Sequence, residues 1–400
     1  MDTRSPGFPR ELLAQAWTSR LEYFRGYTMA HPRLIAVRDA LLAAIQDREP
    51  NSLIVVLGPS GVGKTTLCRK IEQLLVSEML TDLHSDPGRL PVVSVECIAP
   101  ESGTFSWRDQ FYRMLRQMEE PLMAYKLDPG TPVQIGERAL KLMPNAKAAG
   151  LEYRHALEQA LRFRRPSAVL LDEAQHLASV GSGRRLSDQL DVIKSIANCT
   201  GTAHVLLGTY SLLAFRNLSA QLSRRSVDIH FPRYRSDDPA DLKAFRTVLH
   251  SFESHLPLSE PPDLVSEWEY LYERSIGCVG VLKEWLLRAL TAALRKDAKV
   301  LTLRDLESYA LNVAQCDKML AEALEGETRL LESSEERARL RTRLGLTVPA
   351  ARHDDASVHH GVCEAEVPLP RRQRRNPGLR RPMRDAIACP LGTYGTSPAV

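Results

Sequence analysis

The N-terminal two thirds of the chain contain five short runs of apolar residues. The first, Leu53–Leu57, is continuous and ends at Gly58-Pro59, as a strand buried on both faces does. Four more runs have strand length: Val92–Cys97, Ala168–Leu171, Ala203–Leu207 and Val227–Phe231. Helical spacing of apolar residues separates these runs, for example from Thr65 to Met79. Strands that alternate with helices predict an α/β domain with a parallel five-stranded sheet flanked by helices.

The pattern changes on both sides of this domain. Residues 1–50 show helical spacing, and strand-like runs stop after Pro239, where stripes such as Val281, Leu282 and Trp285 take over. From about Val348 no periodicity remains. We therefore expect the following parts: an N-terminal helical segment (1–50), the α/β domain (51–239), a small helical lid domain (240–325), a charged helical extension (326–347) and a disordered basic tail (348–400).

Composition narrows the classes of protein. The net charge is +4, and the tail 348–400 holds eight arginines and five acidic residues, a net charge of +3, so the rest of the chain is nearly neutral. No apolar run is long enough to span a bilayer, and the first residues do not form a secretory signal. The seven cysteines form no C-x-x-C pair, which argues against zinc sites and disulfides and favours a reducing cytoplasm. We expect five of them to be ordinary buried residues: Cys68, Cys97, Cys199, Cys278 and Cys316.

The first candidate site follows the first strand, where the sequence matches the P-loop pattern G-x-x-x-x-G-K-[ST] and opens a helix. Backbone N–H groups of such a loop surround phosphates at a helix N-terminus. We expect Lys64 to reach the β- and γ-phosphates of ATP and Thr65 to ligate Mg²⁺. The predicted nucleotide-binding residues are Gly58, Pro59, Ser60, Gly61, Val62, Gly63, Lys64, Thr65 and Thr66.

A second candidate site ends the third strand, where two carboxylates follow four apolar residues. Asp172 is predicted to hold Mg²⁺, and Glu173 to polarise the water that attacks ATP. The alternative is a helix N-cap with an acidic first turn.

Three further positions are candidates for sensing the nucleotide. Thr209 follows the fourth strand, where a polar residue can contact the γ-phosphate, or it is a simple turn residue. Arg224 and Arg225 precede the fifth strand, as an arginine finger acting on a neighbouring subunit or as a solvated pair. Lys283 opens a lid helix and could reach the γ-phosphate, or it is an exposed helix lysine.

Together these features resemble the AAA+ ATPases, and more closely the transposition regulators TniB, TnsC and MuB. The resemblance covers about residues 20–320 and rests on four stretches: His31-Pro32-Arg33, Gly58 to Leu67, Asp172-Glu173-Ala174-Gln175-His176-Leu177, and Val205-Leu206-Leu207-Gly208-Thr209-Tyr210. It implies assembly with ATP on double-stranded DNA as a ring, spiral or filament of identical subunits. It also implies two protein partners, a DDE transposase and a target-selection protein similar to TniQ or TnsD.

Four residues are candidates for the DNA contact. Arg108 and Thr131 resemble the positions that track one DNA strand in TnsC-like filaments, and each lies at a predicted helix start, after Ser106 and before Pro132. Arg184 and Arg185 lie in a predicted glycine-containing loop after the acidic pair. The alternative is that these positions only cap helices or face solvent.

Two other functions remain open from the sequence. A replication initiator or helicase loader would share the ATPase but usually carries a winged helix after the lid, and no such pattern is evident in residues 300–400. A signalling NTPase scaffold would bind nucleotide with little turnover, which an intact Glu173 disfavours. The tail is interpreted as a partner-binding arm, because seven arginines and no acid lie between Arg371 and Arg384.

Overall fold

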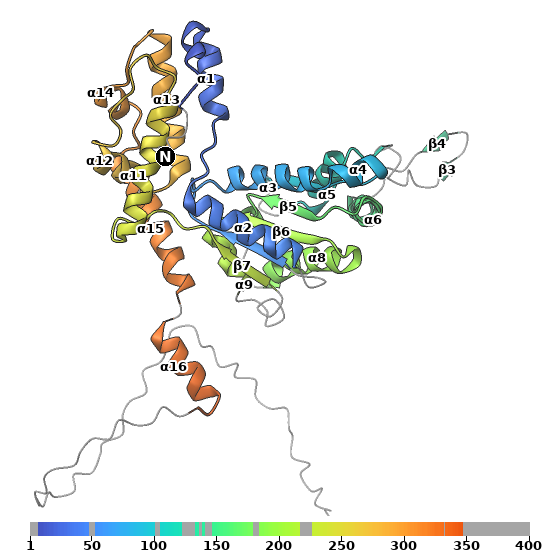
Figure 1. Cartoon of the computed structure of the whole chain (residues 1–400). Helices are drawn as coiled ribbons and strands as arrows, with labels where there is room; N and C mark the ends of the chain where they lie inside the picture. Colours follow the sequence, from blue (N-terminus) through green and yellow to red (C-terminus); the bar gives the residue numbers. More distant parts are fainter. Residues whose placement is uncertain are drawn as a thin grey trace, which may run out of the picture. The chain divides into compact units, whose positions relative to one another are not determined.

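The computed structural model describes residues 7–47, 53–100, 105–121, 133–135, 138–140, 146–178, 184–216, 226–331 and 333–346. Its centre is a five-stranded sheet in which every pair of neighbouring strands is parallel (Figure 1). The strands, in sheet order, are β2 (Val92–Glu96), β5 (Ala168–Asp172), β6 (Ala203–Gly208), β1 (Leu53–Leu57) and β7 (Ser226–His230). The predicted parallel five-stranded sheet is confirmed, with each strand within one residue of its predicted bounds.

Alternate residues of the central strands build two hydrophobic layers. Val55 and Leu206 face one layer, which the helices α5 (Trp107–Gln117), α6 (Ala146–Arg164) and α8 (Arg184–Thr200) cover. Val56 and Leu207 face the other layer, which α2 (Pro32–Gln46) and α3 (Lys64–Glu78) cover. A strand with apolar residues on both faces must be covered on both, so the continuous apolar runs determine this arrangement.

The lid has a separate hydrophobic core around the fully buried Trp285. Four helices build it: α11 (Pro239–His255), α12 (Trp268–Ser275), α13 (Val279–Arg295) and α14 (Leu303–Glu307). The helix α1 (Trp17–Gly26) adds Leu21 and Phe24 to this core, and Arg20 Nε donates to Pro257 O at 2.9 Å. The N-terminal segment is therefore shared, since α1 packs with the lid and α2 packs on the sheet (Figure 1).

Local sequence signals set where several helices begin. His31 caps α2 and Pro32 occupies its first turn, and Asp238 and Pro239 open α11 in the same way. A capping box formed by Asn312 and Gln315 opens α15 (Val313–Leu330). The helix α16 (Ser334–Arg343) follows it, and a second compact unit begins within α16 at Ala338.

Short elements complete the described chain: η1 (Arg10–Ala14), α4 (Leu80–Ser85), α7 (Gln175–Ala178), η3 (Tyr210–Leu212), α9 (Leu213–Arg216), and the antiparallel pair β3 (Val133–Ile135) and β4 (Arg138–Leu140). None of the described helices is long and apolar enough to cross a membrane.

Two expectations need correction. The residues after Pro132 form the strand β3 and not a helix, because Val133 and Ile135 alternate around Gln134 and favour an extended chain. Cys199 is exposed, because it lies in the last turn of α8, whereas Cys68, Cys97, Cys278 and Cys316 are buried as expected. The tail 348–400 lies outside the described residues.

Candidate nucleotide site

The P-loop connects β1 to α3 at the carboxyl edge of the sheet. Gly61 and Gly63 adopt the left-handed φ values of +74° and +114°, which residues with a side chain rarely reach. Gly58 has no room for a side chain, because a Cβ there would lie 2.4 Å from the backbone oxygen of Phe231, which follows the neighbouring strand β7. The glycines of the motif are therefore required by the loop's shape, and that shape directs backbone N–H groups toward an anion at the start of α3.

Lys64 is the only buried lysine among the described residues, with 6% of its surface exposed. Its Nζ donates to Gly58 O at 3.1 Å and Pro59 O at 2.8 Å, so the ammonium lies along the inner side of the loop. Burial lowers the pKa of Lys64, and the nearby carboxylates of Glu173 and Asp172 oppose that shift. The site therefore combines one buried cation with two anions, a set that fits a phosphate and its magnesium ion.

The two carboxylates follow directly from the end of β5. Asp172 is buried, and its Oδ1 accepts the N–H of Glu173 at 2.9 Å. Glu173 takes the left-handed region with a φ of +53°, which turns its side chain away from the strand direction. Gln175 Nε2 donates to Glu173 Oε2. Two carboxylates therefore lie at the carboxyl end of β5 near Lys64, and groups of this kind can hold a metal ion or accept a hydrogen bond from water.

Strand order brings Thr209 to the same edge. The strand β6 lies between β1, which leads to the P-loop, and β5, which leads to the carboxylates. Thr209 follows β6, donates its backbone N–H to Gln175 Oε1 at 3.2 Å, and pairs its hydroxyl with Ser211 Oγ at 2.8 Å. The structure therefore assembles the P-loop, Asp172, Glu173 and Thr209 at one edge, as the sequence predicts for a nucleotide site.

The lid meets the P-loop through the first turn of α13. Val281 donates its backbone N–H to Gly61 O at 3.1 Å, and a Cβ on Gly280 would lie 2.5 Å from the same oxygen. Lys283 is placed differently from its predicted contact with the γ-phosphate. Its Nζ donates to Arg25 O at 3.0 Å and Tyr27 O at 2.7 Å. The reason is helical geometry, because two residues after Val281 the side chain faces the opposite side of α13.

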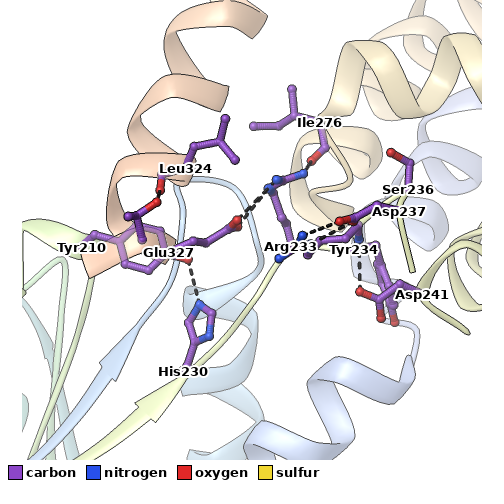
Figure 2. A network of polar contacts seen from close by, with 12 residues as sticks. Tyr210, His230, Arg233, Tyr234, Ser236, Asp237, Asp241, Ile276, Leu324 and Glu327 are labelled. Atoms are coloured by element: carbon purple, nitrogen blue, oxygen red, sulfur yellow. Dashed lines mark hydrogen bonds and ion pairs between the residues drawn. The ribbon is translucent and has the colours of Figure 1, made fainter. Parts of the chain in front are cut away.

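A second contact between the lid side and the sheet forms around α15 (Figure 2). Tyr210, in η3, places its ring against Gly326, where a Cβ would lie 2.0 Å from Tyr210 Cγ, and its hydroxyl pairs with His230 Nε2 at 2.8 Å. Arg233 donates from Nε to Glu327 Oε1 at 2.9 Å, with side chains only 8% and 12% exposed. The helix α15 is thus attached to the segment that carries Thr209 and to the chain that leaves β7.

A cavity of about 220 Å³ lies between these parts. Pro59 and Ser60 of the P-loop line it together with Thr209 and Tyr210, and Glu322 and Arg329 of α15 close the opposite side. The cavity therefore adjoins the P-loop on the side of β6.

The residues predicted to contact DNA or a neighbouring subunit are not placed at this edge of the sheet in the described part of the chain. Arg108 is exposed in the first turn of α5, after Ser106, whose side chain accepts the N–H of Asp109 at 3.3 Å. The backbone of Arg184 and Arg185 opens α8 instead of lying in a loop. Thr131, Arg224 and Arg225 lie outside the described residues.

Sequence reasoning assigned no role to four residues that the structure places around the site: Gln175, Tyr210, Arg233 and Glu327. Gln175 and Tyr210 stood inside the motifs that carry the family resemblance, so their position was a usable signal. Arg233 and Glu327 are 94 residues apart in sequence, and no local pattern connects them.

Comparison with known proteins supports this description of the domain. Residues 47–215 match the family described as "AAA domain". Holliday junction branch migration complex subunit RuvB of Rubrobacter xylanophilus is 33% identical over 99 residues, which are 24% of this chain and 27% of that protein. The chain thus spans about a quarter of the length of that curated relative.

Solved structures also match the chain. The Aeropyrum pernix ORC2 protein in its ADPNP–ADP complexes is 16% identical, with a TM-score of 0.47, and the match covers 73% of this chain and 71% of that one. The A. pernix ORC1 protein in complex with DNA is 19% identical, also with a TM-score of 0.47, over 76% of this chain and 70% of that one.

Proposed function

We propose that this AAA+ ATPase binds and hydrolyses ATP with Mg²⁺ to control its assembly on double-stranded DNA, where it marks a target and recruits a DDE transposase. The observation that carries the ATPase part is the common edge of the sheet, where Lys64, the Asp172–Glu173 pair and Thr209 meet. The transposition part rests on the sequence resemblance to TniB, TnsC and MuB.

Each residue of the edge has one task in this proposal. The P-loop residues from Gly58 to Thr66 surround the phosphates, and Lys64 neutralises their charge. Thr65 and Asp172 hold Mg²⁺, which supplies charge stabilisation at the phosphoryl group being transferred. Glu173 orients the attacking water, and Thr209 senses whether a γ-phosphate is present.

The active site is completed by a second copy of the chain. Arg224 and Arg225 precede β7, and one of them reaches the nucleotide of the neighbouring subunit in a ring, spiral or filament. Replacing both with alanine lowers hydrolysis and assembly together while nucleotide binding by the monomer remains. A variant that hydrolyses ATP normally as an isolated monomer contradicts this part of the proposal.

DNA is held by its backbone in the proposed assembly. Arg108, Thr131, Arg184 and Arg185 contact phosphates, which fix position but carry little sequence information. The exposure of Arg108 at the N-terminus of α5 supports this choice. The tail 348–400 engages the transposase or a target-selection protein similar to TniQ or TnsD, through its cluster of arginines.

The experiment compares Lys64→Ala and Glu173→Gln with the unmodified chain. We expect Lys64→Ala to abolish ATP-dependent DNA binding, and Glu173→Gln to bind ATP, hydrolyse it slowly and dwell longer on DNA. Binding of the unmodified chain should weaken steeply with salt and equally for unrelated duplexes. Transposase capture on DNA-bound protein then tests recruitment, with a chain ending at Thr347 as the comparison.

Separate outcomes contradict separate parts. ATP hydrolysis at the normal rate by Glu173→Gln removes this residue as the base. A footprint restricted to one sequence without partners contradicts backbone binding and favours an initiator-type protein. Equal transposase capture by both chains shows that the tail is not the arm.

A further inference from the structure

The side chain of Gln175 lies between the two parts of the site that must act together. Gln175 opens α7, two residues after Glu173. Its Nε2 donates to Glu173 Oε2, and its Oε1 accepts the backbone N–H of Thr209 at 3.2 Å. One amide therefore joins the carboxylate after β5 to the segment after β6.

The chemistry of its partners fixes which way this amide points. An ionised carboxylate can only accept and a backbone N–H can only donate, so the nitrogen must face Glu173 and the oxygen must face Thr209. Gly208 leaves the space that the amide occupies, since a Cβ there would lie 2.7 Å from Gln175 Oε1. A carboxylate of the same shape at position 175 would present an oxygen to Glu173 and repel it.

We propose that Gln175 is a positioning residue for ATP hydrolysis, which holds the Glu173 carboxylate in place and ties it to Thr209. The amide occupies Oε2 of Glu173 and leaves Oε1 for the attacking water. Movement of Thr209 toward a γ-phosphate is transmitted to Glu173 through the same side chain. This inference rests on the proposed ATPase function and adds how its base is oriented.

The test replaces Gln175 with glutamate, which keeps the shape and removes the donor. We expect steady-state hydrolysis near pH 8 to fall by about 10-fold to 100-fold, the range for a lost hydrogen bond to a charged group. Affinity for ATP should change less than twofold, since the two hydrogen bonds of the Gln175 amide join Glu173 and Thr209 and the phosphates are assigned to the P-loop and Lys64.

The pH profile separates positioning from simple damage. Two adjacent carboxylates share a proton as the pH falls, and that proton restores a donor toward Glu173. The ratio of the Gln175→Glu rate to the unmodified rate should therefore rise from pH 8 to pH 6. Gln175→Leu cannot regain a donor, so its ratio should stay flat.

Gln189→Glu is the matched control. Gln189 in α8 accepts a hydrogen bond from Trp107 Nε1, which a carboxylate preserves, and it lies outside the site. Its rate and pH profile should equal those of the unmodified chain.

A double variant tests the same inference without relying on a pH profile. In single-turnover hydrolysis, Gln175→Leu should add no loss in a Glu173→Gln background, because Gln175 acts only through Glu173. Additive losses, or a Gln175→Glu ratio that does not depend on pH, overturn the inference. Absence of hydrolysis by the unmodified chain, or a rate that survives Lys64→Ala, overturns the proposed function instead.

Discussion

Two of the contacts between the lid side and the sheet domain are built differently. At the P-loop, the first turn of α13 contributes a backbone N–H from Val281 and the bare Cα of Gly280. At β6 and β7, the contact consists of side chains, with the ring of Tyr210 on Gly326 and the buried pair of Arg233 and Glu327. The first contact depends on a backbone hydrogen bond and on the space that Gly280 leaves, whereas the second depends on charge and on aromatic packing.

The difference predicts how each contact fails. A backbone contact survives most substitutions and is broken only by adding atoms where none fit. A buried ion pair is broken by removing one partner, because the other charge remains without compensation. The substitutions below test this contrast and then a third connection at His31, in order of expected effect.

The largest effect should come from Arg233→Ala. It leaves Glu327 buried and also removes donors to Tyr272 Oη and Ile276 O, so we expect a loss of about 3–5 kcal/mol in the free energy of unfolding. Chemical denaturation measures it. Arg235→Ala is the control two residues away, where an exposed pair with Asp237 should contribute little. Similar losses in both variants would contradict the special role of the buried pair.

Gly280→Ala should come next. The added methyl group meets Gly61 O and Gly61 C, at 2.5 Å and 3.1 Å, and a P-loop backbone cannot rotate away as a side chain can. We expect a loss near the upper end of about 1–3 kcal/mol and a weaker affinity for ATP, since the P-loop must shift. Calorimetry with ATP and magnesium measures the affinity. Unchanged affinity would show that α13 does not support the P-loop.

Gly326→Ala should destabilise by a similar amount, about 1–3 kcal/mol, because the added Cβ would lie 2.0 Å from Tyr210 Cγ and rotation of the ring does not move that atom. The sign of the change in the free energy of unfolding is the sharper prediction, because replacing a glycine inside a helix by alanine normally stabilises a protein by up to about 1 kcal/mol. Gly150→Ala in α6 is the control, as its Cβ would have only an ordinary 3.9 Å contact with Arg108 Cβ. If both variants were stabilised, the contact between Tyr210 and Gly326 would not be tight enough to oppose an added methyl group.

The smallest effect concerns pH at the connection between the two cores. His31 Nδ1 accepts the N–H of Leu34 at 3.4 Å and lies 3.0 Å from Tyr234 Oη, so the neutral ring serves as an acceptor. Burial lowers the pKa of His31 to about 4, below its ordinary value. The unfolded chain therefore takes up the proton first, and stability is complete above about pH 6.5 and is lost as the pH falls toward 4.

His31→Asn tests this contribution, because asparagine keeps a capping oxygen for α2 and does not titrate. Between pH 8 and pH 6 the unmodified chain should lose about 1 kcal/mol more than the variant. Denaturant titrations at three pH values measure the difference. A variant that loses as much stability as the unmodified chain would show that His31 is not the group responsible.

Local sequence signals predicted the parts that depend on local chemistry. The run Leu53–Leu57 was predicted to be a strand buried on both faces, and the structure confirms it. The loop predicted after it opens the helix α3 as expected, and Gly61 and Gly63 shape that loop with left-handed φ values. Lys283 was predicted to reach the γ-phosphate, but the side of α13 that faces the P-loop depends on packing. Gly280 packs against Gly61, and Lys283 donates to Tyr27 O instead. The pairing of Arg233 with Glu327 depends on the whole fold and has no local signature.

The sharing of the N-terminal segment between two cores has a mechanical consequence. The chain crosses from the lid to the sheet between α1 and α2, and it returns to the lid between β7 and α11. Two segments of the chain therefore connect the lid with the sheet. His31 and Tyr234 lie on these two segments and contact each other, and Arg33 Nη2 holds Asp241 at 2.6 Å beside them. A body that is joined to another at two adjacent points can rotate about the line between those points. Its rotation about other axes is restricted. We therefore expect motion of the lid relative to the sheet to be mainly one rotation about the line between these two chain segments.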